Sequence, residues 1–334
     1  MQRALVTGAT GLVGSHIVER LRRDNVEVRA LVRSEAAARA ASSLGAIPSR
    51  GDVLDAAAFA RAADGCDVVF HTAAAITPRG GWEAFRHLNV DGTRNAIAAA
   101  ARSGARLLHL SSVAVYGTAS RYGDASRVID EDFPLEPLAD RMFYARSKRE
   151  SEALVFAAQR DGSVWATAVR PCVIYGRRDR QFVPRVARLL SRGVAPLIGT
   201  GAARFSVVHA ANVAEGAVLA ATSDGANGRA YNLANDFEVS VADFFRLGAR
   251  GLGKRVRLIH IPERPARGLL RAAVGALRVF GSDRLSALSD DSLGFLTRDN
   301  PFSSERARRE LDWRPWVPPD VGVPDAFHWW AEHH

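Results

Sequence analysis

The chain has 334 residues, of which 47% are hydrophobic and 24% are charged, and its formal net charge is +9. This composition is typical of a globular protein. Two cysteines, Cys66 and Cys172, exclude a disulfide framework and a cysteine-rich metal site, so no metal is expected. The arginines are spread along the chain without a basic block, which argues against nucleic acid as a partner. There is no apolar run of the roughly 18 residues that span a membrane and no signal-peptide pattern, so we expect a cytoplasmic protein with little membrane contact.

Hydrophobic patterning in the first half predicts strands that alternate with helices. We expect strands at residues 3–7, 27–32, 67–71, 106–110 and 164–170, with a short one ending near 50–52. We expect helices from residue 12 to about 23, from 35 to about 44 and over roughly 82–102. Such alternation predicts an α/β fold with a doubly wound parallel sheet. Ligands bind beyond the carboxyl ends of such strands, where the chain places Gly8–Gly14, Asp52, Ala73–Ala75 and Ser111–Ser112.

A glycine turn separates the first expected strand from the first helix. Gly8, Gly11 and Gly14 form the pattern G-x-x-G-x-x-G. Glycines here allow a tight turn and a close approach of a pyrophosphate to the helix N-terminus. The alternative is a plain strand-to-helix turn. The flanking strand and helix favour a dinucleotide site.

The end of the second expected strand indicates which dinucleotide binds. A carboxylate there would hold the ribose hydroxyls of NAD, but the strand ends in Arg33 and Ser34. A guanidinium suits a 2′-phosphate, and a hydroxyl can add a hydrogen bond. The residues therefore favour NADP(H), with NAD(H) possible. The alternative is that Arg33 is one of many exposed arginines.

A tyrosine and a lysine lie four residues apart, as Tyr144 and Lys148. On a helix this spacing places both side chains on one face. An ammonium beside a phenol lowers the pKa of the phenol and lets it exchange a proton. Lys148 and Lys254 are the only lysines among 45 basic residues, which indicates that arginine cannot replace Lys148. The alternative is an exposed lysine beside a core tyrosine.

These features and further motifs resemble the extended short-chain dehydrogenase/reductase family over essentially the full chain. The motifs are Thr7–Gly14, Gly51–Asp52, His71–Ala74, Asn89–Thr93, Leu110–Gly117, Tyr144 with Lys148, and Arg170–Gly176. The resemblance implies a Rossmann sheet with a smaller, mixed C-terminal substrate lobe. The dinucleotide-binding domain is expected at 1–171, with 207–235 returning to it. The substrate-binding lobe is expected at 172–206 and 236–330.

The resemblance also implies site residues. Ser112, Tyr144 and Lys148 would be catalytic, with Ser111 a neighbour that could be mistaken for Ser112. The cofactor would contact Gly8, Thr10, Gly11, Leu12, Val13, Gly14, Arg33, Ser34, Asp52, Val53, Ala73, Ala74, Ala75, Asn89, Ser111, Tyr144, Lys148, Pro171, Cys172 and Val173. For Asn89, a structural hydrogen bond to backbone is an equal alternative. The family often has paired acids near positions 211 and 212, which are absent here, so no role is assigned to Asn212.

A basic amphipathic helix is expected over 265–280. Its apolar residues have helical spacing and are accompanied by three arginines, Arg267, Arg271 and Arg278. Such a helix can lie on a membrane. Packing against the substrate lobe, as a wall of the pocket, is the favoured alternative.

Three functions fit these residues. The favoured one is an NAD(P)-dependent oxidoreductase that transfers a hydride between nicotinamide and a ketone or secondary alcohol on a mainly apolar small molecule. The chain resembles the 3β-hydroxysteroid dehydrogenase, dihydroflavonol reductase and 2-alkyl-3-keto acid reductase branches. The second is a nucleotide-sugar epimerase with the same three catalytic residues and tightly bound NAD, which Arg33 disfavours. The third is a cofactor-sensing protein without catalysis, which Tyr144 and Lys148 disfavour. The family also implies a possible homodimer through the helices at 82–102 and 144–159.

Overall fold

The computed structural model describes residues 1–76, 80–117, 128–234, 236–265 and 290–334. Seven parallel strands form the main sheet in the order β10-β6-β5-β4-β1-β2-β3. Their bounds are β1 Arg3–Thr7, β2 Glu27–Val32, β3 Ile47–Arg50, β4 Val68–His71, β5 Arg106–Leu110, β6 Ala166–Pro171 and β10 Ala230–Leu233. This order is that of a doubly wound Rossmann sheet, so the predicted fold class is confirmed.

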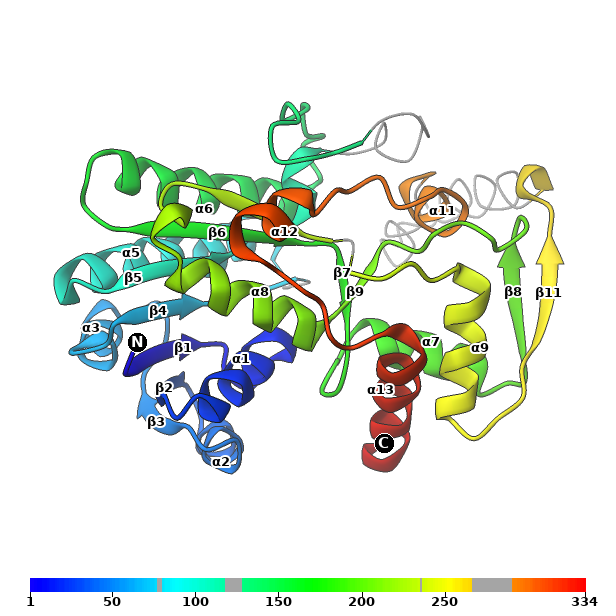
Figure 1. The fold of residues 1–334 in the computed structure, drawn as a ribbon, viewed down its shortest axis with the longest axis horizontal. Coiled ribbons are helices and arrows are strands. Elements are labelled where there is room, and N and C mark those ends of the chain that lie inside the picture. Colours follow the sequence, from blue (N-terminus) through cyan, green and yellow to red (C-terminus); the bar gives the residue numbers. More distant parts are fainter. Residues whose placement is uncertain (77–79, 118–127, 235, 266–289) are drawn as a thin grey trace.

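Helices cover both faces of this sheet (Figure 1). One layer consists of α1 Leu12–Arg23, α2 Glu35–Ser43 and α8 Ala210–Thr222. The other consists of α3 Ala56–Ala63, α5 Gly92–Ser103 and α6 Phe143–Arg160. Alternate residues of β1 explain the two layers, because side chains of a strand point to opposite faces. Ala4 and Val6 pack in the first core, whereas Leu5 packs in the second.

A second, smaller lobe lies beside the carboxyl ends of the sheet's strands (Figure 1). It contains α7 Phe182–Leu190, α9 Val241–Gly251, α11 Asp290–Thr297 and α13 Pro319–His333. It also contains the parallel pair β8 Val194–Ile198 and β11 Arg257–Ile261. A short pair, β7 Val173–Tyr175 and β9 Val207–His209, lies between the lobes. The helix α12 Glu305–Leu311 contacts β10 and α8, so it belongs to the sheet side.

Two expectations about helices need comment. The helix predicted over 82–102 is divided into α4 Gly81–Phe85, a π-helical segment η1 Arg86–Asp91 and α5. Two single 3-10 turns are η2 Val113–Tyr116 and η3 Asp224–Ala226. The basic amphipathic helix predicted at 265–280 falls on 266–289, outside the described residues.

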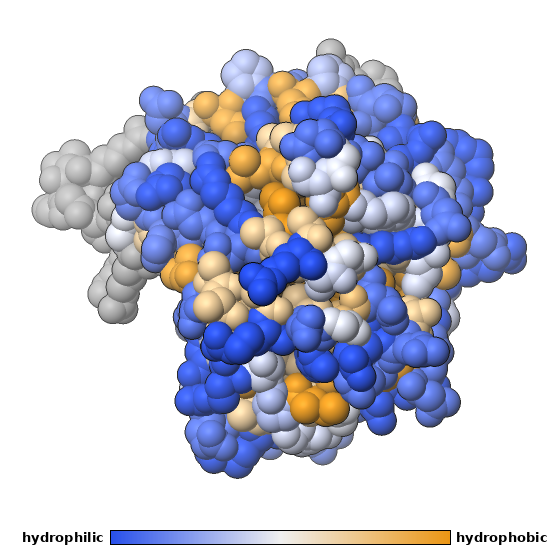
Figure 2. Space-filling model, turned by 90° about the vertical axis from the view of Figure 1, so that its left-hand side faces the viewer, coloured by the Kyte–Doolittle hydropathy of each residue, from blue (hydrophilic) through white to orange (hydrophobic). Residues whose placement is uncertain are grey.

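The two ends of the sheet differ. Figure 2 shows the end at which β1 begins, and hydrophilic residues cover most of it around a narrower strip of apolar ones. At the opposite end the carboxyl termini of the strands face the second lobe. The expected site residues that follow these strands therefore lie at this end of the sheet.

A buried ion pair ties α6 to the sheet. The Arg170 guanidinium donates to both carboxylate oxygens of Glu152, at 2.5 and 3.0 Å, and to the hydroxyl of Tyr116 at 2.8 Å. Both charged side chains are less than a tenth exposed. Removal of one partner from such a pair leaves a buried charge without compensation.

We expect Glu152→Ala to lower the free energy of unfolding by about 3–5 kcal/mol. Urea denaturation measures this. The matched control is Arg246→Ala, which removes an exposed pair with Asp243 and should cost less than about 1 kcal/mol. Equal losses in the two variants would contradict the role of burial.

Candidate active site

The glycine turn has the geometry of a phosphate-binding loop. Gly8 has φ +68°, which favours glycine, and a Cβ on it would lie 2.9 Å from the amide nitrogen of Ala73. A Cβ on Gly14 would overlap the carbonyl of Gly8, so α1 can approach β1 only with glycine there. Gly11 is the N-cap of α1, and no side chain caps this helix. The N-terminus of α1 is therefore open to an anion.

The side chains next to the glycine turn differ in how exposed they are. Val13 is buried in the core, so its backbone alone can face a cofactor. Thr10 and Leu12 are half-buried, and the Leu12 carbonyl accepts from His16 Nδ1 at 2.8 Å. The loop presents mainly backbone groups, as a pyrophosphate site requires.

Arg33, Ser34 and Asp52 meet where β2 and β3 end. The side chain of Arg33 is 72% exposed, and its Nη1 lies 3.6 Å from Asp52 Oδ2. The other oxygen of Asp52 accepts from the Leu54 amide at 3.0 Å. Ser34 caps α2 by accepting from the Ala37 amide, so its hydroxyl proton is free to be donated elsewhere. Val53 is half-buried, and its carbonyl accepts from Asn95.

Asn89 holds the segment that follows β4. Its Oδ1 accepts from the Ala75 amide at 2.7 Å, and its Nδ2 donates to the Ala75 carbonyl at 3.0 Å and to Ser147 Oγ at 2.9 Å. The side chain is 2% exposed. These bonds use both donors and one lone pair of the amide, as the structural alternative expects, and the contact of Asn89 with the cofactor stays a prediction. Ala73 and Ala75 are half-buried beside it, and Ala74 is exposed.

Ser112 and Tyr144 face each other at the carboxyl end of β5. The Ser112 hydroxyl is near enough to the phenol to lower the pKa of Tyr144, and Ser112 also caps the turn η2. Tyr144 and Lys148 lie in the first turns of α6, as the four-residue spacing predicts. Lys148 is 4% exposed, and its Nζ donates to the Leu110 carbonyl at 2.6 Å. The three side chains that the sequence predicts to be catalytic therefore gather around the ends of β5 and α6.

The pKa of Tyr144 differs from the expectation. Burial raises the pKa of this phenol, and the hydrogen bond from Ser112 opposes the rise without cancelling it. The net direction is opposite to the lowering expected from Lys148, whose ammonium donates to the Leu110 carbonyl. Burial lowers the pKa of Lys148 itself to about 8, and the charge of Glu152 partly opposes this.

Residues 171–173 link the sheet to the second lobe. Pro171 ends β6, and the Val173 amide donates to the Ser206 carbonyl at 3.3 Å. The Cys172 thiol donates to the Ala234 carbonyl at 3.4 Å, and burial raises its pKa well above the usual value. The thiol is therefore unreactive, and only the backbone here is suited to contact a cofactor.

A family model described as the NAD dependent epimerase/dehydratase family matches residues 4–234. The chain belongs to this family. The resemblance to extended short-chain dehydrogenases/reductases and the enzyme class that it implies are confirmed.

The chain has relatives whose names are those of oxidoreductases. A Stigmatella aurantiaca 4-hydroxy-2-methyl-3-oxo-4-farnesyl-3,4-dihydroquinoline-1-oxide ketoreductase is 31% identical over 96% of this chain and 94% of its own. A 3 beta-hydroxysteroid dehydrogenase/Delta 5-->4-isomerase of Mycobacterium tuberculosis is 29% identical over 94% and 86%. The solved structure of gox2253 has a TM-score of 0.80 and 26% identity, covering 100% of this chain and 99% of that one.

The residues present fit the NAD-type cofactor of the family. Glycine at positions 8 and 14 lets the loop pack closely against Ala73 and against the start of α1, whose N-terminus no side chain caps, so a pyrophosphate can approach the backbone there. The hydroxyl of Ser111, buried at the end of β5, has no hydrogen-bond partner among the described residues, so a polar group can be accommodated beside it. Two of the three Lys148 donors remain for the ribose of a nicotinamide nucleotide.

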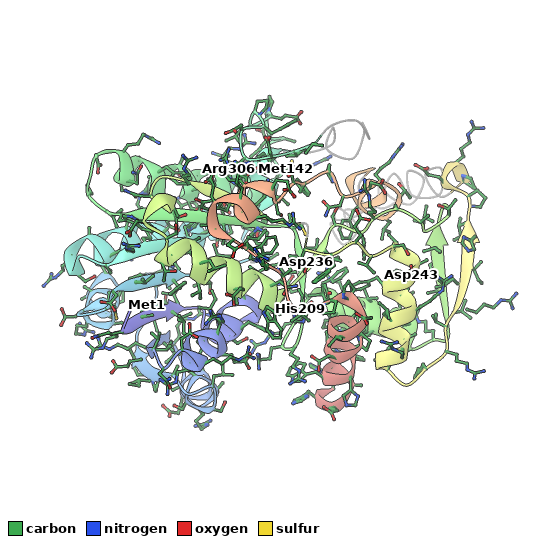
Figure 3. All side chains as sticks on the ribbon, viewed as in Figure 1. Met1, Met142, His209, Asp236, Asp243 and Arg306 are labelled. Atoms are coloured by element: carbon green, nitrogen blue, oxygen red, sulfur yellow. The ribbon has the colours of Figure 1, made fainter. Side chains whose placement is uncertain are left out.

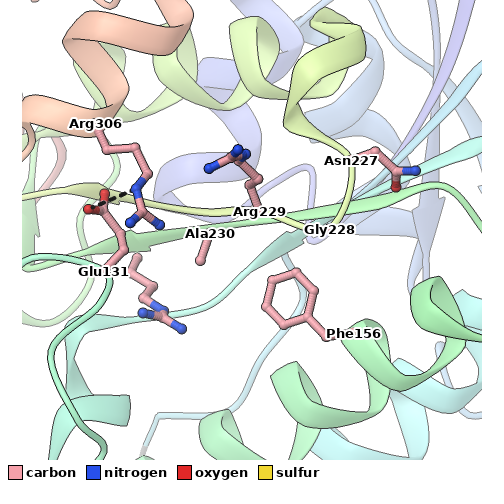
Figure 4. A pocket seen from close by; sticks show the side chains of 8 residues that line it. Glu131, Phe156, Asn227, Gly228, Arg229, Ala230 and Arg306 are labelled. Carbon is pink, nitrogen blue, oxygen red and sulfur yellow. Dashed lines mark ion pairs between the residues drawn. The ribbon is translucent and has the colours of Figure 1, made fainter.

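A separate pocket of about 450 Å³ lies at the β10 edge of the sheet (Figure 4). Its walls include Phe156, Arg229 and the pair Arg306–Glu131, whose charged atoms are 3.6 Å apart. None of the three catalytic candidates lines it. It is therefore not the site of the family's chemistry.

Asn212 has a structural role that the sequence did not reveal. Its Oδ1 accepts from the amides of Trp316 and Val317, and its Nδ2 donates to Asp236 and to the Val317 carbonyl. Asp236 also accepts from the backbone of His209, and both lie between the lobes (Figure 3). The buried asparagine thus attaches the C-terminal segment to α8. An amide can do this because it both donates and accepts, which the paired acids expected from the family cannot.

Proposed function

We propose that this protein is an NADP(H)-preferring ketoreductase or alcohol dehydrogenase that acts on a mainly apolar small molecule. The observation that carries the proposal is the meeting of Ser112 and Tyr144 beside a buried Lys148, at the strand ends that face the glycine loop. The names of the relatives support the same reaction class.

The chain's own residues can manage the proton and the charge on oxygen. When bound, the nicotinamide supplies or accepts the hydride. A carbonyl that gains the hydride becomes negative at oxygen, and the Ser112 hydroxyl can stabilise this charge by a hydrogen bond. Tyr144 can donate the proton, since its raised pKa keeps the phenol protonated at neutral pH. In the reverse direction Tyr144 is the base.

The preference for NADP(H) rests on the ends of β2 and β3. Arg33 is exposed, and Arg50, which ends β3, is 57% exposed. Val32 and Arg50 are register partners, so both guanidiniums start from the same edge of the sheet. Arg50 is near Glu35, at 3.9 Å, whereas the exposed Arg33 and the free hydroxyl of the adjacent Ser34 suit a 2′-phosphate better than two ribose hydroxyls.

We expect Arg33→Asp to shift the ratio of kcat/KM for NADPH over NADH toward NADH by about tenfold to hundredfold, since it replaces an attraction for phosphate by a repulsion. Steady-state kinetics with both cofactors measure the ratio. Arg160→Asp is the control, because it makes the same charge change at the exposed end of α6. An unchanged ratio in Arg33→Asp would refute the role of Arg33.

An apolar substrate is supported by the names of two relatives, one of which specifies a substrate with a farnesyl group and the other a steroid. The rings of Phe182, Phe205 and Phe295 pack in the core of the second lobe, with the Phe205 and Phe295 centroids 4.7 Å apart. The test is to follow NADPH absorbance with a panel of steroid, flavonoid, β-keto acid and aryl ketones. The alternative, a nucleotide-sugar epimerase, predicts silence across the panel and nicotinamide bound to the protein as isolated.

A small-molecule substrate, a homodimer through α5 and α6 and a cytoplasmic location remain part of the proposal. No helix among the described residues is long and apolar enough to span a membrane. Sedimentation of the purified protein tests the dimer.

A further inference from the structure

A chain of buried side chains connects the glycine strand to the helix of Tyr144. The participating hydroxyl, imidazole and amide groups come from β1, β4, α5, η1 and α6. They are Thr7, His71, Thr93, Asn89 and Ser147, and each is at most 2% exposed. Hydrogen bonds within such a dry network are strong, and an incomplete one is costly.

The protons in this network have one consistent arrangement. The Thr93 hydroxyl donates its single proton to the backbone carbonyl of Asn89 at 2.6 Å, so it must accept from His71 Nε2 at 3.2 Å. His71 therefore carries its proton on Nε2, and its Nδ1 accepts from the Thr7 hydroxyl at 2.9 Å. That hydroxyl in turn accepts from the Ala73 amide at 3.3 Å. Burial lowers the pKa of His71 to about 3, which keeps the ring neutral as this arrangement requires.

The two ends of the network lie at the candidate site. Ala73 is held by Thr7, and Ala75 is held by the side chain of Asn89. The same Asn89 side chain donates to Ser147, whose hydroxyl donates to the backbone carbonyl of Tyr144 at 2.8 Å. The segment expected to line the cofactor and the residue expected to move the proton are thus both connected, through hydrogen bonds, to the imidazole of His71.

We propose that His71 is a positioning residue: its Nε2–H tautomer completes the hydrogen-bonded chain that fixes Ala73–Ala75 relative to Tyr144. The inference rests on the proposed function for its kinetic consequence. A displacement of about 1 Å between a cofactor and a proton donor can reduce turnover by about a hundredfold. The residue acts without touching substrate, so binding of substrate should change less than turnover.

Thr93 offers the sharpest pair of variants. Thr93→Val keeps the shape of the side chain and removes the hydroxyl, whereas Thr93→Ser keeps the hydroxyl. We expect Thr93→Val to lower kcat by about tenfold to hundredfold with KM changed less than about threefold. Thr93→Ser should retain more than about half of the wild-type kcat. Wild-type kcat in Thr93→Val, or an equal loss in Thr93→Ser, would overturn the proposal.

His109 provides the matched control for His71. It is the register partner of His71 on β5, it is equally buried, and its ring centroid lies 5.9 Å from that of His71. Its Nε2 is hydrogen-bonded to Ser151, whose hydroxyl donates to the backbone carbonyl of Lys148, so His109 does not hold residues 73–75. We expect His71→Phe to lower kcat as Thr93→Val does and to speed amide exchange at residues 70–76, and His109→Phe to leave that exchange unchanged. Equal exchange at residues 70–76 in the two variants would show a packing effect and overturn the proposal.

Hydrogen–deuterium exchange tests the network without a substrate. In Thr93→Val, peptides covering residues 70–76 and 142–150 should both exchange faster than in wild type, whereas Thr93→Ser should leave them unchanged. Unchanged exchange in Thr93→Val would overturn the link. If none of the ketones in the panel is reduced by the wild-type protein with NADPH, the proposed function fails. Hydrogen–deuterium exchange alone still decides whether the network exists.

Discussion

Tyr144→Phe is expected to lower the rate of ketone reduction by about 10²- to 10⁴-fold, the usual contribution of a positioned proton donor. The substitution removes the phenolic hydroxyl that faces Ser112 and leaves the aromatic ring in place. NADPH should still bind, because the glycine loop is untouched. Stopped-flow absorbance under single-turnover conditions measures the chemical step, and quenching of protein fluorescence measures NADPH affinity.

The control for Tyr144→Phe is Tyr231→Phe. Tyr231 lies on the edge strand β10, and the substitution removes its hydroxyl, which donates to Glu310 at 3.2 Å. Turnover should remain within about twofold of wild type in this control. A Tyr144→Phe protein with wild-type turnover would refute the assignment of Tyr144 as proton donor.

The raised pKa of Tyr144 also gives a prediction for the reverse reaction. Alcohol oxidation needs the phenolate as base, and burial makes the phenolate rarer at neutral pH. The kcat/KM for oxidation should therefore rise with pH through the alkaline range, whereas reduction should not need alkaline pH. A bound nicotinamide cation would favour the phenolate and move this rise to lower pH.

Most of the sheet and the expected site segments could be predicted because short-range chemistry specifies them. The continuous apolar run Ala4–Val6 specifies β1 as a strand buried on both faces, and Gly8 and Gly14 specify the turn through steric exclusion that the structure shows directly. Ser34 caps α2 by accepting from the amide three residues later. Each of these depends on a few neighbouring residues.

The features that the sequence did not reveal depend on contacts between distant segments. Asn212 holds residues more than 100 positions later, and Asn89 bridges Ala75 and Ser147. The direction of the pKa of Tyr144 depends on how deeply α6 is buried and on where Lys148 donates. Helical spacing places Tyr144 and Lys148 on one face, but it does not say which carbonyl the ammonium meets.

Lys148→Arg is expected to lower kcat/KM by at least about 100-fold, although it preserves the charge. Lys148 is 4% exposed, and its compact ammonium lies 2.6 Å from the Leu110 carbonyl. A planar guanidinium is larger and would have to displace α6 or leave the site. Lys254→Arg is the natural control, because this other lysine is exposed and donates to the Ser191 carbonyl at 3.1 Å. Similar kinetics for the two variants would show that the site tolerates any cation.

The pH dependence of Lys148 follows from its lowered pKa. In the folded protein the ammonium is present below about pH 8 and is lost as the pH rises through that value. The kcat/KM for reduction should fall over the same range, and this fall should be absent in Lys148→Arg. In the unfolded chain the lysine keeps its proton up to about its ordinary pKa of 10.5.

Between about pH 8 and 10.5 the unfolded chain thus binds more protons at Lys148 than the folded chain, so this residue's cost to stability shrinks as the pH rises. Lys148→Met removes that cost at every pH. Its stability advantage over wild type in urea should therefore be largest near pH 7 and smaller at pH 9.5. A stability advantage of Lys148→Met that stays constant with pH would show that burial of the Lys148 ammonium does not destabilise the fold.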